Sequence, residues 1–199
     1  MQLHYFIQSI EDALSKECYL PALALTLIIP DMCAKYDYAE LLKKGTFSYD
    51  GHSKNGGAYA KWYDINILGY EFPDYISTNM SIEEISKHYE LLEKTTITGW
   101  QCWKLRCALL HEGNINISEL FSKNDPRINF KFRISDSYCG VSESICTLDI
   151  NDNVTNITVH EDLVTFCHKI LAVFKNSYMN DKNFLLETEK KNINIEFEL

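Results

Sequence analysis

A single arginine, Arg106, lies inside an otherwise apolar segment of the chain. Residues Trp100 to His111 have helical spacing, and at about 100° per residue apolar or thiol side chains flank Arg106 on both sides. A charge within such an apolar arc is costly unless it is paired or lies at an interface. Arg106 is therefore expected to be half of a buried ion pair or part of a functional site. The flanking residues are Trp103, Cys107 and Leu110 on one side and Cys102, Leu105 and Leu109 on the other, with Gln101, Lys104, Ala108 and His111 on the opposite, wetter face.

The length and composition are those of one globular domain. The chain has 199 residues, 46% of them hydrophobic and 24% charged, which is enough to bury one good core. We expect a helical core at about 1–113 and 161–180, a β insertion at about 127–160 and a tail at 181–199. The excess of tyrosine and tryptophan indicates core packing rather than a base-stacking platform.

Five segments have the spacing of helices that bury one side. Pro21 suits the first turn of the second segment, whereas Pro30 is expected to kink or end it. Ser81 and Glu84 have capping-box spacing and predict a further helix. The glycine-containing segment Tyr36–Ala58 is expected to be a loop. The five helices are Leu3–Leu14, Cys18–Ala34, Tyr59–Leu68, Thr98–His111 and Glu161–Tyr178.

The period changes after the helix that contains Arg106. Residues Ile128–Ile134 alternate between apolar and polar side chains, which is typical of a half-buried strand. Ile145–Ile150 and Val154–Val159 are weaker strand candidates, joined by a turn, and Asn192–Leu199 alternates as an edge strand would. The expected fold class is mainly α, a helical bundle with a small β-hairpin or sheet inserted after the helix of Arg106.

The charge of the chain restricts a role in nucleic-acid binding. A formal net charge of −9 opposes nonspecific attraction to phosphate backbones, so such a role requires a local basic patch. The best candidate lies at residues 123–133, where four cations outnumber one acid. The same cations also fit a solvated strand edge that is kept from aggregating by its charge. They are Lys123, Arg127, Lys131 and Arg133.

Cysteine usage and hydropathy predict a cytoplasmic protein. The seven cysteines, an odd number without a CxxC pair, indicate reduced thiols. No secretory signal is visible. The most apolar run, Leu20–Pro30, is too short to cross a bilayer, so no membrane contact is expected.

Arg106 and His111 form an Arg-x4-His motif at the end of a helix in a mainly helical chain. The context of the motif consists of Leu27-Ile28-Ile29-Pro30-Asp31-Met32-Cys33, Tyr59-Ala60-Lys61-Trp62-Tyr63-Asp64 and Cys102-Trp103-Lys104-Leu105-Arg106-Cys107-Ala108-Leu109-Leu110-His111-Glu112-Gly113. Together these segments resemble the HEPN superfamily, in particular a bacterial and plasmid-borne branch of it. The resemblance covers the chain from Leu20 to Gly113.

The resemblance implies an HEPN-like helical bundle and a metal-independent endoribonuclease of toxin or defence type. Arg106 would hold the phosphate and His111 would act as acid and base, roles that suit a planar guanidinium and an imidazole that titrates near neutrality. Positions five apart lie about 140° apart on an ideal helix. Because HEPN ribonucleases pair the motif helices of two subunits, a homodimer is implied. RNA is the implied substrate, and a cognate antitoxin or another protein is a candidate partner.

An alternative interpretation needs no catalysis. HEPN ribonucleases usually carry a polar residue, often asparagine, directly after the arginine, where this chain has Cys107. In the alternative, Arg106 pairs with a buried carboxylate, Asp31 or Asp64, and His111 caps the helix C-terminus. The domain would then be a non-catalytic HEPN-like module that binds a partner protein or a nucleotide.

Cys107 and His111 also have the i, i+4 spacing of a thiolate–imidazole pair or of two metal ligands. No third residue supports either site, and a buried structural cysteine beside a histidine at the helix end is the favoured interpretation. Glu112 is a further supporting or ion-pair candidate. No metal and no cofactor are therefore expected.

Overall fold

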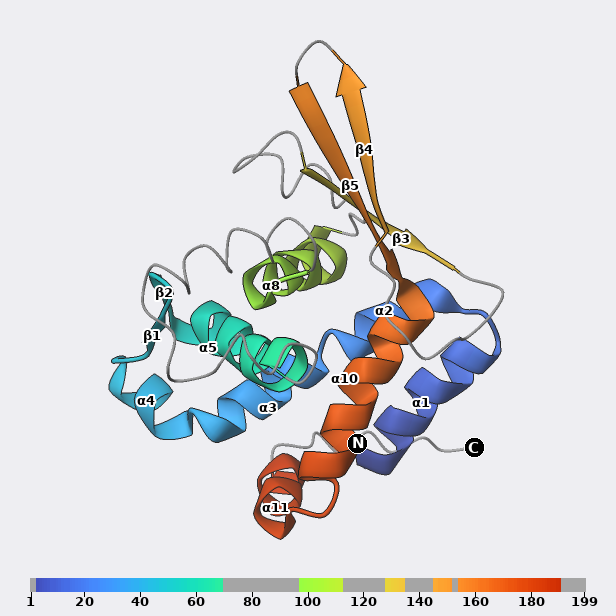
Figure 1. Ribbon diagram of the computed structural model, residues 1–199. Coiled ribbons are helices and arrows are strands. Elements are labelled where there is room, and N and C mark those ends of the chain that lie inside the picture. The colour runs from blue at the N-terminus through green and yellow to red at the C-terminus, as the bar shows by residue number, and fades with distance from the viewer. Residues whose placement is uncertain (1–2, 70–96, 113–127, 135–144, 152–153, 191–199) are drawn as a thin grey trace.

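The computed structural model describes residues 3–69, 97–112, 128–134, 145–151 and 154–190. In this part of the chain the protein is mainly helical, with a three-stranded sheet at one end of the helical body (Figure 1). This confirms the mainly α fold class and the small sheet. No described helix is both long and apolar enough to cross a membrane. The predicted helix after Ser81, the helix stop at Gly113 and the alternating segment Asn192–Leu199 lie outside the described residues.

The N-terminal helices follow the apolar pattern of the sequence. Helix α1, Leu3–Ser15, buries an i, i+3, i+4 stripe as predicted. The expected second helix is two helices, α2 at Tyr19–Thr26 and α3 at Ile29–Asp37. Pro30 lies in the first turn of α3, where its missing N–H costs no hydrogen bond. The helical run is interrupted near Pro30, but this proline begins a helix instead of ending one.

The segment that was predicted to be a loop contains a helix, a hairpin and the start of another helix. Asp50 and Gly51 both have positive φ, as a tight hairpin turn requires. A Cβ on Gly57 would lie 2.3 Å from the His52 carbonyl oxygen, so this glycine lets the hairpin pack against the helix that follows it. The elements of this segment are α4 (Ala39–Lys44), β1 (Ser48–Tyr49), β2 (His52–Ser53) and α5 (Lys54–Tyr63).

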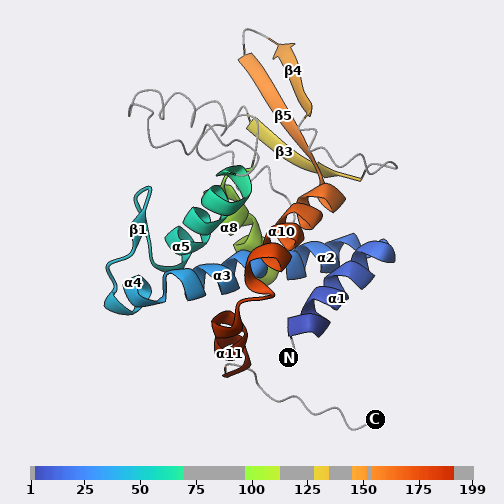
Figure 2. The same cartoon turned by 60° about the horizontal axis from the view of Figure 1, so that its bottom comes forward.

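The core lies where α5 packs against α3 and α8 (Gly99–Cys107), and where α10 (Leu163–Tyr178) packs against α2 and α3. Trp62 is fully buried at its centre and donates from Nε1 to the Tyr178 hydroxyl at 2.7 Å. After α10, the segment predicted as a tail begins with helix α11, Lys182–Lys190, whose Phe184 is buried in the same core. Figure 2 shows α11 beyond the end of α10.

The sheet has the strand order β3-β5-β4. Strands β4 and β5 form the predicted antiparallel hairpin, and β3 pairs parallel to β5, with Arg133 beside Asp162 at the end of the register. In Figures 1 and 2 this hairpin extends away from the helices, and β5 runs directly into α10. The strands are β3 (Ile128–Arg133), β4 (Ile145–Asn151) and β5 (Val154–Asp162).

Candidate functional site

The motif helix α8 begins at a dense set of buried contacts. The Thr98 hydroxyl accepts from the Gln101 N–H and the Gln101 side chain accepts from the Thr98 N–H, which forms a capping box. Asp64 Oδ1 accepts from the Gly99 N–H at 2.7 Å. A Cβ on Gly99 would lie 2.2 Å from the Ala60 carbonyl oxygen. Helix α8 therefore crosses α5 in a contact that only glycine allows, and the N–H groups of Gly99 and Gln101 in its first turn are satisfied.

The hydrogen-bond pattern of the motif helix changes after Cys107. Residues Ala108–Glu112, segment η3, are π-helical, so their hydrogen bonds span five residues instead of four. A similar segment, η1 at Asp64–Leu68, follows α5. In a π-helical turn, residues i and i+5 lie on nearly the same side, whereas in an α-helix they are about 140° apart. His111 lies in this turn and Arg106 lies two residues before it, so the wider turn reduces the angle between the two side chains.

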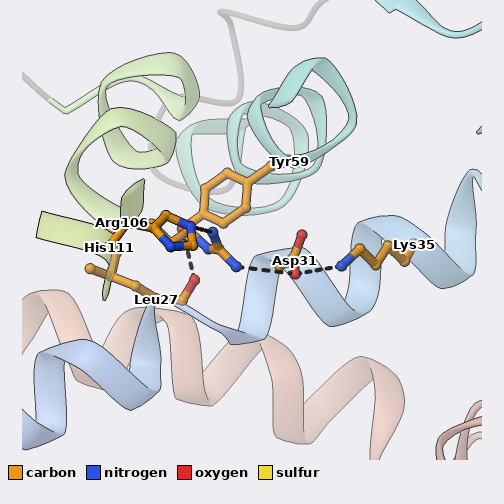
Figure 3. Close-up of polar contacts among 6 residues, drawn as sticks. All are labelled: Leu27, Asp31, Lys35, Tyr59, Arg106 and His111. Carbon is orange, nitrogen blue, oxygen red and sulfur yellow. Dashed lines mark hydrogen bonds and ion pairs between the residues drawn. The ribbon is translucent and has the colours of Figure 1, made fainter. Parts of the chain in front are cut away.

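Figure 3 shows that Arg106 and His111 are in direct contact. Nη1 of Arg106 lies 3.0 Å from Nε2 of His111. Because arginine has only donors, the histidine Nε2 accepts, and the imidazole proton of this arrangement lies on Nδ1. His111 is exposed, whereas the Arg106 side chain is 17% exposed. The separation of about 140° for positions five apart on an ideal helix therefore does not keep these two side chains apart, and the π-helical turn contributes to their contact.

Asp31 is the carboxylate partner of Arg106 (Figure 3). Nη2 of Arg106 lies 3.7 Å from Asp31 Oδ2, and Lys35 Nζ, one turn along α3, lies 2.8 Å from the same oxygen. The guanidinium carbon also lies 5.1 Å from the centroid of the Trp103 ring, a cation–π distance. The arginine Nε is buried, and no described residue accepts a hydrogen bond from it. The guanidinium thus contacts an acid, an imidazole and an indole, and its Nε has no acceptor among the described residues.

Asp64 is the other carboxylate that was considered as a partner of Arg106. It instead contacts the N-terminal end of α8. It is 5% exposed, and besides the Gly99 N–H it accepts from the Tyr49 hydroxyl at 3.1 Å. Burial raises the pKa of Asp64 to about 6, although both hydrogen bonds act to lower it. Asp31 is therefore the carboxylate in contact with Arg106, and Asp64 fixes the start of the motif helix.

The remaining predicted residues lie at the end of the motif helix, on β3 or outside the described residues. Cys107 is half-buried at the end of α8, and Glu112 is the last residue of η3. Lys131 is exposed and Arg133 is half-buried, both on β3. Lys123 and Arg127 lie outside the described residues, so the basic patch stays a prediction.

Two features of the site were missed in the sequence. Lys35 contacts Asp31, as the motif arginine does. The i, i+4 spacing of Asp31 and Lys35 on one helix could have predicted this ion pair. His52 stacks flat on Trp100, with 3.5 Å between ring centroids and 9° between planes. No local pattern announces this contact, because the two residues are far apart in the sequence.

No protein-family model, curated protein or solved structure matches this chain. Within the described ranges, no three histidine, cysteine, aspartate or glutamate side chains are grouped so that they could hold a metal ion. The site is therefore defined by its own geometry, a guanidinium and an imidazole in contact at the end of a firmly capped helix.

Proposed function

We propose that the protein is a metal-independent endoribonuclease in which Arg106 and His111 act on one phosphate of an RNA strand. The observation that carries the proposal is the 3.0 Å contact between Arg106 Nη1 and His111 Nε2 at the end of the motif helix. It puts a phosphate-binding cation and a proton acceptor within reach of the same group. A toxin or defence role, with an antitoxin or another protein as partner, follows from the HEPN resemblance and belongs to the same proposal.

The reaction is a proton transfer coupled to phosphoryl transfer. When a phosphate binds the guanidinium of Arg106, its hydrogen bond to His111 Nε2 is released. Nε2 then takes the proton of a 2′-hydroxyl, and the 2′-oxygen attacks the adjacent phosphorus. The guanidinium of Arg106 binds the phosphorane oxygens, on which negative charge accumulates. The bond from phosphorus to the 5′-oxygen breaks, and the imidazolium returns its proton to that oxygen. The products are a 2′,3′-cyclic phosphate end and a 5′-hydroxyl end.

The charges around Arg106 support phosphate binding. Asp31 holds the guanidinium beside His111, and Lys35 shares the same carboxylate oxygen. Two cations therefore surround one acid, which leaves a local positive charge in a chain whose net charge is −9. Such a local charge is what an acidic protein needs in order to bind a phosphate.

A second function is favoured by a different observation. Arg106 is mostly buried and paired with Asp31, as a purely structural ion pair would be. In that case the domain is a non-catalytic HEPN-like module that binds a partner protein or a nucleotide, and His111 only closes the helix end. Cys107, in place of the polar residue that usually follows the motif arginine, favours the same function.

The deciding experiment compares the wild-type protein with His111→Ala on an end-labelled single-stranded RNA in EDTA. We expect the wild type to cleave and to leave 2′,3′-cyclic phosphate ends. The variant should be slower by at least about 100-fold, the usual contribution of general acid–base catalysis. His4→Ala is the matched control, because His4 is an exposed histidine on α1.

Purification of the three proteins in parallel separates their own activity from that of a contaminating ribonuclease. Cleavage at equal rates by the wild type and His111→Ala, or no cleavage by any of them, would contradict the ribonuclease and favour the binding module. His4→Ala should cleave like the wild type.

A homodimer packed through the motif helix is also part of the proposal, since the HEPN resemblance implies it. The π-helical turn removes the need for a second subunit to complete the Arg106–His111 pair. Leu110, 37% exposed beside this pair, still offers apolar surface for a second copy. Sedimentation velocity at micromolar concentration should therefore show a dimer, and a monomer alone would remove this part of the proposal without touching the cleavage test.

A further inference from the structure

The start of α8 carries an aromatic side chain that does not belong to the core. Trp100 is half-buried, and it is not among the described residues that form the hydrophobic core or pack against it. Its ring lies flat on His52 of the β1–β2 hairpin, with 3.5 Å between centroids. Trp103, nearly one turn further along, is half-buried beneath the guanidinium of Arg106. By contrast, Trp62 is fully buried.

We propose that Trp100 and His52 form a base-stacking platform for unpaired RNA at the start of the helix whose other end carries Arg106. This inference rests on the proposed ribonuclease function and names the class of its substrate, a single strand rather than a duplex. The parallel His52 ring covers one face of Trp100 at stacking distance, so a base would extend the stack on the outer face of one of the two rings. Stacking on aromatic side chains is a common way in which proteins hold unpaired bases, and bases within a duplex are not free to use it.

Cations lie beside both tryptophans, as a strand with phosphates requires. Lys104 Nζ is 5.8 Å from the centroid of the Trp100 ring, and the guanidinium carbon of Arg106 is 5.1 Å from that of Trp103. Each ring is thus combined with a positive charge, which matches the base and the phosphate of one nucleotide. Since the net charge of the chain opposes long-range attraction, short-range contacts of this kind must supply the affinity.

The spacing along α8 fits a short strand. Trp100 and Arg106 are six residues apart, which corresponds to about 9 Å along a helix axis. Stacked nucleotides rise about 3.4 Å each, so this distance is covered by about two or three nucleotides. A phosphate held at Arg106 would therefore leave the base of a nearby nucleotide within reach of Trp100.

The test measures binding of the full-length protein to two fluorescent hexamers. One is 2′-O-methyl hexaadenylate, which cannot be cleaved by 2′-hydroxyl attack, and the other is an abasic hexamer with the same phosphates. We expect Trp100→Leu to weaken binding of hexaadenylate by about tenfold and to leave binding of the abasic hexamer unchanged. Trp100→Phe, which keeps a planar ring, should bind hexaadenylate within about threefold of the wild type.

Tyr5→Leu is the matched control, because Tyr5 is an aromatic residue on α1 that is 58% exposed. It should bind both hexamers like the wild type. The platform is overturned if Trp100→Leu binds hexaadenylate like the wild type, if it weakens both hexamers equally while Trp100→Phe does the same, or if the wild type binds neither.

The two proposals fail separately. Cleavage by the wild type together with unchanged hexaadenylate binding by Trp100→Leu removes the platform alone. Binding that depends on Trp100, without cleavage by the wild type, removes the ribonuclease and leaves a single-strand binding surface.

Discussion

The N-terminal end of α8 is buried and fixed by backbone contacts, whereas the C-terminal end of the motif helix carries polar groups to the surface. At the first end, Gly99 lies against the backbone of α5 and its N–H is bonded to Asp64. At the second end, a π-helical turn brings the exposed His111 to Arg106. The two ends also use different carboxylates, since Asp31 rather than Asp64 meets the arginine.

The first end of the motif helix fixes its position, and the second end carries the side chains of the proposed chemistry. A helix whose start is fixed by close backbone contact has a defined direction, and its far end can hold polar groups that would be costly inside the core. Single π-helical turns are frequent at functional sites. We therefore expect larger changes of stability from substitutions at the first end than from substitutions at the second.

The largest effect is expected for Gly99→Ala. The added Cβ would lie 2.2 Å from the Ala60 carbonyl oxygen, so the two helices must move apart. We expect the free energy of unfolding, measured with urea, to fall by about 3 kcal/mol or more. Gly45→Ala is the control, because nothing lies within 4 Å of its Cβ and only its φ of +68° is strained, at a cost of about 1–2 kcal/mol. Equal losses would show that the crossing is not tight.

Asp64→Asn should change how stability depends on pH. Burial raises the pKa of Asp64 from 3.8 to about 6, so the folded protein binds this proton more tightly than the unfolded chain does. The stabilising contribution is complete below about pH 4 and is lost as pH rises through about 6, up to about 3 kcal/mol in total. Asparagine does not titrate. The unfolding free energy of the variant, taken relative to that of the wild type, should therefore rise by up to about 3 kcal/mol between about pH 4 and about pH 8.

The control for this pH profile is Asp12→Asn, which changes an exposed aspartate on α1. Its unfolding free energy should follow that of the wild type across the same range. Parallel profiles for Asp64→Asn and the wild type would contradict a buried carboxyl with a raised pKa.

Arg106→Ala should cost less, about 1 kcal/mol, because Asp31 keeps Lys35 at 2.8 Å. Lys35→Ala alone should cost about 0.5 kcal/mol, since the lysine side chain is 46% exposed. The double variant leaves Asp31, 7% exposed, without either cation. We expect it to lose at least about 1 kcal/mol more than the sum of the single variants. Additive losses in urea denaturation would mean that the two cations do not share one carboxylate.

The smallest effect on stability is expected for His111→Ala. His111 is exposed at the end of the motif helix, so its removal should change the unfolding free energy by no more than about 0.5 kcal/mol. Thermal melting followed by circular dichroism measures this change. A loss as large as that of Gly99→Ala would instead mark His111 as part of the structural framework.

Periodicity predicted the long elements because their burial is regular. The stripe of α1 and the length of α10 follow such local patterns of burial. The pairing of β4 with β5 agrees with the alternation and the turn residues in the sequence. Helix α4 was missed because it has no buried residue and hence no apolar period. Its neighbour α5 was predicted to begin too late, since Gly56 and Gly57 resemble a loop and are needed for close packing.

The residues in contact with Arg106 were among those considered in the sequence, but their arrangement could not be predicted. The sequence names Arg106 and His111 but leaves the carboxylate open between Asp31 and Asp64. In addition, α-helical spacing puts Ala108 on the wetter side and Leu110 on the apolar side. In the structure Ala108 is 2% exposed and Leu110 is 37% exposed. A π-helical turn leaves no mark in an α-helical period, so only the folded chain reveals which side chains meet.

The junction between β5 and α10 has a mechanical consequence. The strand ends at Asp162 and the helix begins at Leu163, with no residue between them, and the Asp162 carboxylate accepts from the Thr165 N–H at 2.8 Å. The projecting hairpin and the core helix are therefore joined without a linker and should move as one unit (Figure 1). A load that pulls or twists the hairpin is transmitted as torque to α10, whereas a flexible linker would absorb it.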